Sequence, residues 1–173
     1  MLTGTKEIKL IESALNGDQS SFKELYEYHV DGLFAFLSQF SNDRELVKDW
    51  TQSAFIKAFT KLESFKKNSR FKTWLFTIGM NEMRTAFRKK IHFEDLSDLE
   101  TIPVEEEPQE LENWKTAKAA IQQLSPDKKM IVILHIAEGY SHREISEMLS
   151  IKEGTSRIIL HRAKEELRNK VTQ

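Results

Sequence analysis

The chain has 173 residues, 39% of them hydrophobic and 31% charged, with a formal net charge of -1, and this length suits one ordinary domain or two small ones. No apolar run approaches the roughly 18 residues that span a bilayer, and the N-terminus lacks the apolar core of a signal peptide, so we expect a cytoplasmic protein with no membrane insertion. The absence of cysteine excludes disulfides, thiolate metal sites and thiol nucleophiles.

The N-terminal part of the sequence predicts four helices and no strand. Apolar residues recur at helical spacing in four segments, which are residues 5–15, 20–40, 43–62 and 70–90. Ser21 and Glu24 have the spacing of a capping box at the start of the second helix. Only three prolines and six glycines interrupt the chain, which favours long helices. We therefore predict an all-α fold.

Basic and aromatic residues are interleaved from Lys57 to Lys90. This segment has ten Lys and Arg residues and only two acidic ones. Basic groups bind phosphates, and aromatic faces stack unpaired bases. Phe71 and Trp74 keep helical spacing and are expected in the core, whereas Phe65 lies outside that stripe and is the best candidate for touching a base. The alternative for each aromatic residue is ordinary core packing.

An acidic segment divides the chain. Residues 94–112 hold nine carboxylates and no Lys or Arg, and two prolines interrupt any helix there. We therefore expect two small helical domains, residues 1–93 and 114–173, joined by a flexible acidic linker over residues 94–113. Both domains are cationic, with 15 basic against 11 acidic residues in the first and 11 against 7 in the second.

The C-terminal domain has the pattern of a helix-turn-helix. Ser125 and the proline after it predict a helix start with proline at the first helical position. Ser141 and Glu144 have capping-box spacing at the start of a later helix. Gly154 is expected where the chain turns, with Thr155 capping the helix that follows.

The last helix has one apolar and one basic face. Its apolar residues have the spacing of a buried stripe and are Ile159, Leu160, Ala163 and Leu167. The basic residues left mostly outward are Arg157, His161, Arg162, Lys164 and Arg168. A helix-turn-helix places such a face in the major groove of DNA. The alternative is a helical hairpin whose charged face is merely solvated.

Short motifs in both domains follow a recognisable order. They are Gly17-Asp18 with Phe22, Asp49-Trp-Thr-Gln52 with Phe55, Phe71-Lys-Thr-Trp-Leu75 with Asn81, Leu124-Ser-Pro, Glu138-Gly-Tyr-Ser141 and Leu160-His-Arg-Ala163. This order resembles the extracytoplasmic-function (ECF) branch of the bacterial sigma factors, and the resemblance covers nearly the whole chain. It implies two helical domains, sigma domains two and four, that bind core RNA polymerase and direct it to promoters.

The resemblance also implies which residues make each contact. The helix over residues 43–62 would bind a coiled coil of the largest polymerase subunit, with Asp49, Gln52 and Ser53 at the contact positions. The first domain would melt and read the -10 element, through Phe65, Asn68, Arg70, Lys72, Asn81, Arg84, Arg88 and Lys89. The second domain would read the -35 element, through Thr155, Arg157, Ile158, His161 and Arg162. For these surface positions, a solvated helix face is the alternative.

The partners implied by the resemblance are core RNA polymerase, promoter DNA and an anti-sigma factor that holds the protein inactive. Family linkers pass near the polymerase active centre, where negative charge could mimic nucleic acid. An acidic tether that keeps two basic domains soluble and apart is the alternative for this linker.

The sequence departs from the family pattern at five positions. The family commonly has Glu where this chain has Ser53, and basic residues at the positions of Thr77 and Met80. Ile158 and Ile159 stand where polar or basic residues are common. We expect Ile159 to be buried and Ile158 to project toward the groove, where it could meet a thymine methyl group.

Two other classes of protein are compatible with parts of the sequence. A conventional helix-turn-helix regulator would bind duplex DNA without polymerase, and a helical adaptor would bind only proteins. The basic and aromatic segment from Lys57 to Lys90 disfavours both, because neither needs to stack unpaired bases. The five histidines have no metal-ligand spacing and no Gly-rich phosphate loop is present, so we expect neither an enzyme nor a cofactor.

Overall fold

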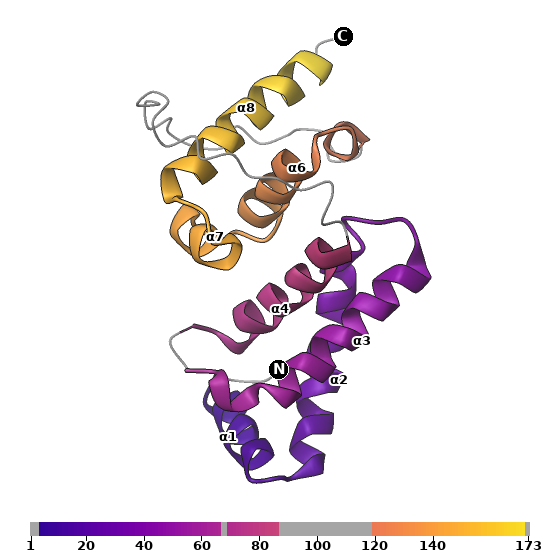
Figure 1. The fold of residues 1–173 in the computed structure, drawn as a ribbon, viewed down its shortest axis with the longest axis vertical. Helices are drawn as coiled ribbons and strands as arrows, with labels where there is room; N and C mark the ends of the chain where they lie inside the picture. Colours follow the sequence, from indigo (N-terminus) through magenta and orange to yellow (C-terminus); the bar gives the residue numbers. More distant parts are fainter. Residues whose placement is uncertain (1–3, 67–68, 87–118, 172–173) are drawn as a thin grey trace. The chain divides into compact units, whose positions relative to one another are not determined.

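A computed structural model of the protein describes residues 4–66, 69–86 and 119–171. These residues form helices and turns, and no strand occurs among them, which confirms the predicted all-α fold. The chain divides into two compact units, Met1–Arg88 (the N-terminal unit) and Lys89–Gln173 (the C-terminal unit). Figure 1 draws the helices of the first in indigo to magenta and those of the second in orange to yellow. The expected linker lies outside the described residues.

The described part of the N-terminal unit has four α-helices and a short 3-10 helix. These are α1 (Gly4–Leu15), α2 (Gln19–Leu37), α3 (Arg44–Thr60), η1 (Leu62–Ser64) and α4 (Phe71–Ala86). Helices α2, α3 and α4 pack against one another, while α1 packs on α2 and also contacts η1. The four helices fall in the predicted segments, although α2 ends earlier than expected, at Leu37.

Helix α2 begins with a different cap from the one that the sequence predicts. Asp18 is the N-cap, and its carboxylate accepts hydrogen bonds from the backbone N–H groups of Ser20 (3.3 Å) and Ser21 (3.1 Å). Hydrogen bonds from the hydroxyls of Ser21 and Ser20 lower the pKa of the Asp18 carboxyl. The predicted capping box of Ser21 and Glu24 is wrong, because Ser21 already lies inside the helix and bonds to the residue that caps it.

The three helices α2, α3 and α4 of the N-terminal core pack closely at Gly79, which has no side chain. A Cβ atom at Gly79 of α4 would lie 2.9 Å from Leu33 Cδ1, 3.5 Å from Leu37 Cδ1 and 3.6 Å from Ala54 Cβ. Leu33 and Leu37 belong to α2 and Ala54 to α3, and all three are fully buried. Since protein interiors are close-packed, an added methyl group must displace one of these side chains. Gly79 therefore sets how closely the three helices approach.

The C-terminal unit contains the predicted helix-turn-helix. Within residues 119–171 its helical elements are α6 (Pro126–Val132), the π-helical turn η2 (Ile133–Ala137), α7 (His142–Leu149) and α8 (Glu153–Val171), and residues 119–122 are also helical. Ser125 is the N-cap of α6, with proline at the first helical position, as predicted. The capping box of Ser141 and Glu144 is confirmed, with the Glu144 N–H donating to Ser141 Oγ (3.2 Å) and the Ser141 N–H donating to Glu144 Oε2 (2.9 Å).

The turn between α7 and α8 lies earlier than expected. Ser150 takes the left-handed conformation, with φ of 56°, and ends α7. The Ile151 N–H then donates to the Ser146 carbonyl at 3.1 Å, and α8 begins at Glu153. The prediction that the chain turns at Gly154 is wrong, because the left-handed step that reverses the chain occurs at Ser150. Gly154 therefore lies in the first turn of α8.

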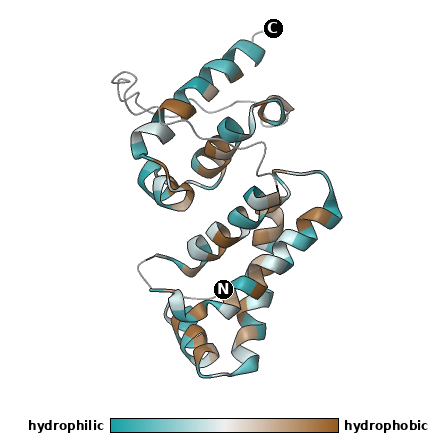
Figure 2. Ribbon diagram, viewed as in Figure 1, coloured by the Kyte–Doolittle hydropathy of each residue, from teal (hydrophilic) through white to brown (hydrophobic). Residues whose placement is uncertain are grey.

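Burial follows the predicted stripe in the helix-turn-helix. Ile145, Met148 and Leu149 of α7 are buried, and so are all four residues of the stripe predicted for α8. Figure 2 shows hydrophobic and hydrophilic residues alternating along the helices of both units, as expected where one face of each helix is covered. Among the described residues, no helix combines the length and apolar character needed to cross a membrane.

A matched pair of glycines tests the packing at Gly79. Gly32 is exposed in the middle of α2, and a Cβ there would meet only Phe76 Cζ at 3.9 Å. Gly32→Ala should stabilise the N-terminal unit by about 1 kcal/mol through helix propensity. Gly79→Ala gains the same propensity but crowds Leu33, so it should be about 1–3 kcal/mol less stable than Gly32→Ala. Urea unfolding followed by tryptophan fluorescence measures the free energy of unfolding of both variants. Equal stabilisation would show that the packing at Gly79 accommodates a methyl group.

Candidate functional site

The outward face of α8 carries three of the predicted -35 contacts. Arg157 and Arg162 are exposed, as predicted, whereas His161, also expected to point outward, is half-buried. Arg157 Nη2 lies 2.5 Å from Glu153 Oε1, and His161 Nδ1 lies 3.6 Å from Glu165 Oε2. In each pair the two residues are one helical turn apart and at least partly exposed, so the ion pair can be exchanged for a contact to phosphate at little cost.

Two other predicted -35 contacts are buried. Thr155 is 2% exposed and Ile158 is 6% exposed. Helix α8 packs against both α6 and α7, so a wide arc of its surface is covered. The prediction that Ile158 projects toward the groove is therefore wrong, and neither its side chain nor that of Thr155 is free to meet a base. Ile159, in contrast, is buried as predicted.

A second surface lies along α3. Asp49 and Gln52 are exposed, and Ser53 is half-buried, so these predicted polymerase contacts share the face opposite the core. Ile56 is on the same face, three and four residues beyond Ser53 and Gln52, and is 60% exposed. Sequence reasoning missed Ile56, although it departs from the helical spacing of the buried residues, which was the available signal.

The third surface begins at η1 and continues along α4. Phe65 is only 9% exposed, and its ring centroid lies 5.6 Å from that of Phe71 and 5.3 Å from that of Trp74. The prediction that Phe65 stands apart from the core is wrong, because η1 turns the chain so that this ring packs onto the start of α4. Trp74 was expected in the core, yet it is half-buried and forms the partly open edge of the three-ring cluster.

Polar residues extend this surface along α4. Asn81 is exposed and lies seven residues after Trp74, so the two occupy the same side of the helix. Arg84 is half-buried, and burial lowers the pKa of its guanidinium. Arg70 and Lys72 are exposed at the start of α4, where Lys72 Nζ lies 4.8 Å from the centroid of the Phe76 ring.

Not all of the predicted -10 residues can be placed. Asn68, Arg88 and Lys89 lie outside the described residues. Within the described residues, the basic excess of this segment is partly offset, because Lys57 Nζ pairs with Glu82 Oε1 at 2.6 Å and joins α3 to α4.

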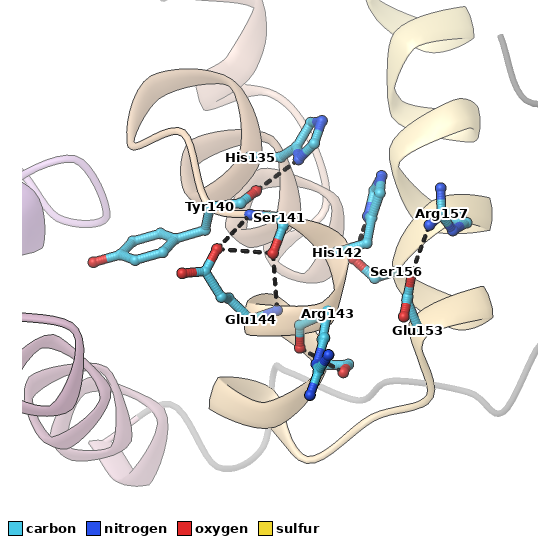
Figure 3. Close-up of polar contacts among 10 residues, drawn as sticks. His135, Tyr140, Ser141, His142, Arg143, Glu144, Glu153, Ser156 and Arg157 are labelled. Atoms are coloured by element: carbon cyan, nitrogen blue, oxygen red, sulfur yellow. Dashed lines mark hydrogen bonds and ion pairs between the residues drawn. The ribbon is translucent and has the colours of Figure 1, made fainter. Parts of the chain in front are cut away.

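A partly buried polar cluster joins the two helices of the helix-turn-helix, and sequence reasoning did not find it (Figure 3). His142 Nδ1 lies 2.9 Å from Ser156 Oγ, and His135 Nδ1 lies 2.8 Å from the Tyr140 carbonyl oxygen. The two imidazole rings stack, with centroids 4.4 Å apart and planes at 17°. Burial, assisted by His135 and Arg157, lowers the pKa of His142 to about 4, so this ring is neutral at pH 7.

Comparison with known families accounts for both units. A family model described as sigma-70 region 2 matches residues 25–91, and one described as sigma-70, region 4 matches residues 116–167. The first therefore covers most of the N-terminal unit, including the α3 and α4 surfaces, and the second covers the helix-turn-helix.

Individual relatives match along nearly their whole length. The chain is 30% identical to the ECF RNA polymerase sigma-E factor of Haemophilus influenzae over 94% of this chain and 93% of that protein. It is 29% identical to RNA polymerase sigma factor CarQ of Myxococcus xanthus over 91% and 93% of the two chains.

Two solved structures have a similar fold. The sigma factor RpoE of Bartonella quintana, determined in complex with the anti-sigma factor NepR, matches with a TM-score of 0.65 and 26% identity over 87% of this chain and 96% of that one. CnrH, in complex with the cytosolic domain of CnrY, gives a TM-score of 0.67 at 23% identity over 94% and 95% of the two chains, which supports the fold alone. With both sigma-70 regions present in order and an ECF sigma factor 30% identical along 93% of its length, the chain belongs to the ECF branch of the sigma-70 family.

Proposed function

We propose that this sigma factor divides its work among the three surfaces described above. The exposed face of α3 binds core RNA polymerase, the surface from η1 along α4 holds the melted -10 strand, and the outward face of α8 reads the -35 duplex. The observation that carries this proposal is the order of the two sigma-70 regions along the chain, each with an exposed polar face on the helix concerned. The division into residues 1–93, 94–113 and 114–173 is part of the proposal.

The α3 face is suited to binding a protein partner. It combines a carboxylate, Asp49, and an amide, Gln52, with the exposed apolar side chain of Ile56. Polar groups around a small apolar centre are typical of protein interfaces. Ser53 lies at the edge of this face, where its small side chain leaves room for a larger partner residue.

The α4 surface is suited to single-stranded DNA. Trp74 offers a partly exposed aromatic face, and the Asn81 amide on the same side of α4 offers both a hydrogen-bond donor and an acceptor to a base edge. Phe65 and Phe71 hold the Trp74 ring from behind, so Phe65 acts in this proposal as a support and not as a base contact. Arg70, Lys72 and Arg84 supply positive charge for phosphates, and Asn68, Arg88 and Lys89 are proposed from the sequence alone.

The α8 face is suited to duplex DNA. Arg157 and Arg162 present guanidinium groups, which bind phosphates and guanine edges in two-point contacts, and His161 lies between them. Thr155 and Ile158 contribute by anchoring α8 against its neighbours.

An anti-sigma factor is the proposed regulator. The solved Bartonella quintana relative is bound to one, and the present chain matches 96% of that protein. Such a partner would regulate the protein by covering the surfaces that bind polymerase or DNA. A conventional regulator that binds duplex DNA without polymerase is disfavoured, because it leaves the region 2 match without a role.

Removing the Asp49 carboxylate should weaken polymerase binding. For Asp49→Ala we expect a loss of about 1–2 kcal/mol, roughly tenfold in affinity, since it removes a charged hydrogen-bonding group beside the apolar centre of the interface. Competition with labelled protein for sigma-free core polymerase measures this. Glu27→Ala, which removes an equal charge from the exposed face of α2, is the control and should bind core polymerase with wild-type affinity. If both variants lost affinity equally, the loss would come from the change in net charge, and the α3 face would not be the binding surface.

Removing the Asn81 amide should impair promoter melting. Asn81→Ala should reduce open-complex formation by roughly tenfold, because about 1–2 kcal/mol of hydrogen bonding to the unstacked base is lost. Permanganate reactivity of unpaired thymines measures the melted fraction. Asn42→Ala, which removes an exposed amide from the turn before α3, is the matched control and should leave open-complex formation unchanged. If Asn81→Ala instead abolished binding to core polymerase, the assignment of this surface to DNA would be wrong.

Arg162 should contribute to the salt dependence of promoter binding. If its guanidinium contacts a phosphate, Arg162→Ala reduces the slope of log affinity against log salt by about 0.9. The measurement is holoenzyme binding to a promoter fragment from 50 to 200 mM salt, conditions over which phosphate contacts dominate the change. Lys23→Ala, which removes one exposed charge from α2, should leave the slope unchanged, and an unchanged slope for Arg162→Ala would mean that the α8 face is only solvated.

A further inference from the structure

We propose that His142 and Ser156 form a positioning pair that fixes the recognition helix α8 against α7. The proposal rests on the proposed reading of the -35 duplex by α8. The pair makes no contact with DNA in this proposal: it acts through the neighbouring residue Arg157 and through the rest of the outward face of the same helix.

Ser156 is a hydroxyl in an apolar setting. It is 0% exposed and lies among the buried residues of α8, with Thr155 before it and Ile158, Ile159 and Leu160 following. A buried hydroxyl without a hydrogen bond is costly, and the described residues contain no buried side-chain polar atom left without a partner. His142 Nδ1, at 2.9 Å, supplies the side-chain partner for Ser156.

The hydrogen bond between His142 and Ser156 joins the N-terminal ends of α7 and α8, so it constrains the angle between these two helices. His142 is the first residue of α7, and Ser156 is in the first turn of α8 (Figure 3). The apolar stripes of the two helices can slide or rotate slightly without losing burial, because hydrophobic contact is non-directional. A hydrogen bond has a strict distance and angle, so this one selects a single arrangement.

His142 is itself held in place from the other side. Its ring stacks on His135, which lies in the π-helical turn η2. Since a carbonyl oxygen only accepts, the contact between His135 Nδ1 and the Tyr140 carbonyl requires a proton on His135 Nδ1. That hydrogen bond fixes the His135 ring, and with it the surface against which His142 rests. The contacts thus run from η2 through His142 to α8.

The charges around His142 favour its neutral form. His135 from η2 and Arg157 and Lys164 from α8 oppose a positive charge on this ring, while Glu153 favours one. A neutral imidazole can accept a hydrogen bond from the Ser156 hydroxyl at Nδ1 and remain stacked on His135. The pair therefore holds its arrangement at neutral pH.

The pair is well placed to affect DNA reading. Arg157 follows Ser156 directly, and Arg162 is less than two turns further along α8. Base and phosphate contacts depend on placement to within a fraction of an ångström to one ångström. A helix that rocks at its first turn would weaken every contact on its outward face without removing any contacting group.

Substitutions of His142 that differ in reach test the proposal. An Asn amide can occupy the place of Nδ1 and keep the hydrogen bond to Ser156, whereas the longer Gln amide cannot be placed there, and Phe keeps only the ring. His142→Phe, His142→Gln and Ser156→Ala should each weaken holoenzyme binding to a promoter fragment selected by the wild-type holoenzyme by about tenfold, while His142→Asn stays within about twofold. Binding to core polymerase should be unchanged in all four.

Two further readouts separate positioning from other roles. The salt slope of promoter binding should remain at the wild-type value in each variant, since no charged group that contacts phosphate is removed. A slope reduced by about 0.9 in His142→Phe would show that a positively charged His142 neutralises a phosphate, and would overturn the proposal. The double variant that combines His142→Phe with Ser156→Ala should lose less promoter affinity than the product of the two single-variant losses, because both substitutions break the same hydrogen bond. Equal loss in His142→Asn and His142→Gln, or fully multiplicative losses, would also overturn it.

The outcome can be distinguished from failure of the proposed -35 role. If α8 does not read DNA, Arg162→Ala has no effect on promoter binding, and neither do the His142 variants. If α8 reads DNA but the pair does not position it, Arg162→Ala weakens binding and His142→Gln does not. His142→Asn and His142→Gln both introduce an amide and differ only in length. The comparison of their promoter affinities therefore tests the proposal even if His142→Phe fails to fold.

Discussion

The placement of α8 between α6 and α7 is the constraint on which the C-terminal unit depends. A helix packed by two neighbours is buried over a wide arc, and here residues on three successive positions, Ile158, Ile159 and Leu160, are all covered. Only a narrow outward strip remains for DNA. That strip consists of charged and polar residues, because the apolar ones are needed to hold the helix.

The same constraint raises the importance of local polar contacts. Two short helices, α6 and α7, cannot fix the angle of a 19-residue helix through apolar contact alone, since such contact tolerates small rotations. The capping box at Ser141 fixes where α7 begins, and the left-handed residue Ser150 fixes where it ends. The pair of His142 and Ser156 adds a directional contact between the start of α7 and the first turn of α8.

In the N-terminal unit, the close approach of three helices fixes which side of α4 faces solvent. Gly79 lets α4 lie against α2 and α3, which places the opposite side of α4, with Trp74 and Asn81, toward solvent. The aromatic cluster of Phe65, Phe71 and Trp74 then ties the segment after η1 to the start of α4. An aromatic residue that is partly exposed beside a packed cluster is held rigidly, so it loses little conformational freedom when a base stacks on it.

The sequence by itself determined the helical class, the position of the helices to within a few residues, the Ser141 capping box and the buried stripe of α8, because these depend on spacing along one helix. It also determined the family, through the order of short motifs. Only the tertiary structure decided that Phe65 and Ile158 are covered, that Trp74 is partly open to solvent, and that His142 meets Ser156. These depend on which neighbouring helix covers each face, and spacing within a single helix carries no information about that.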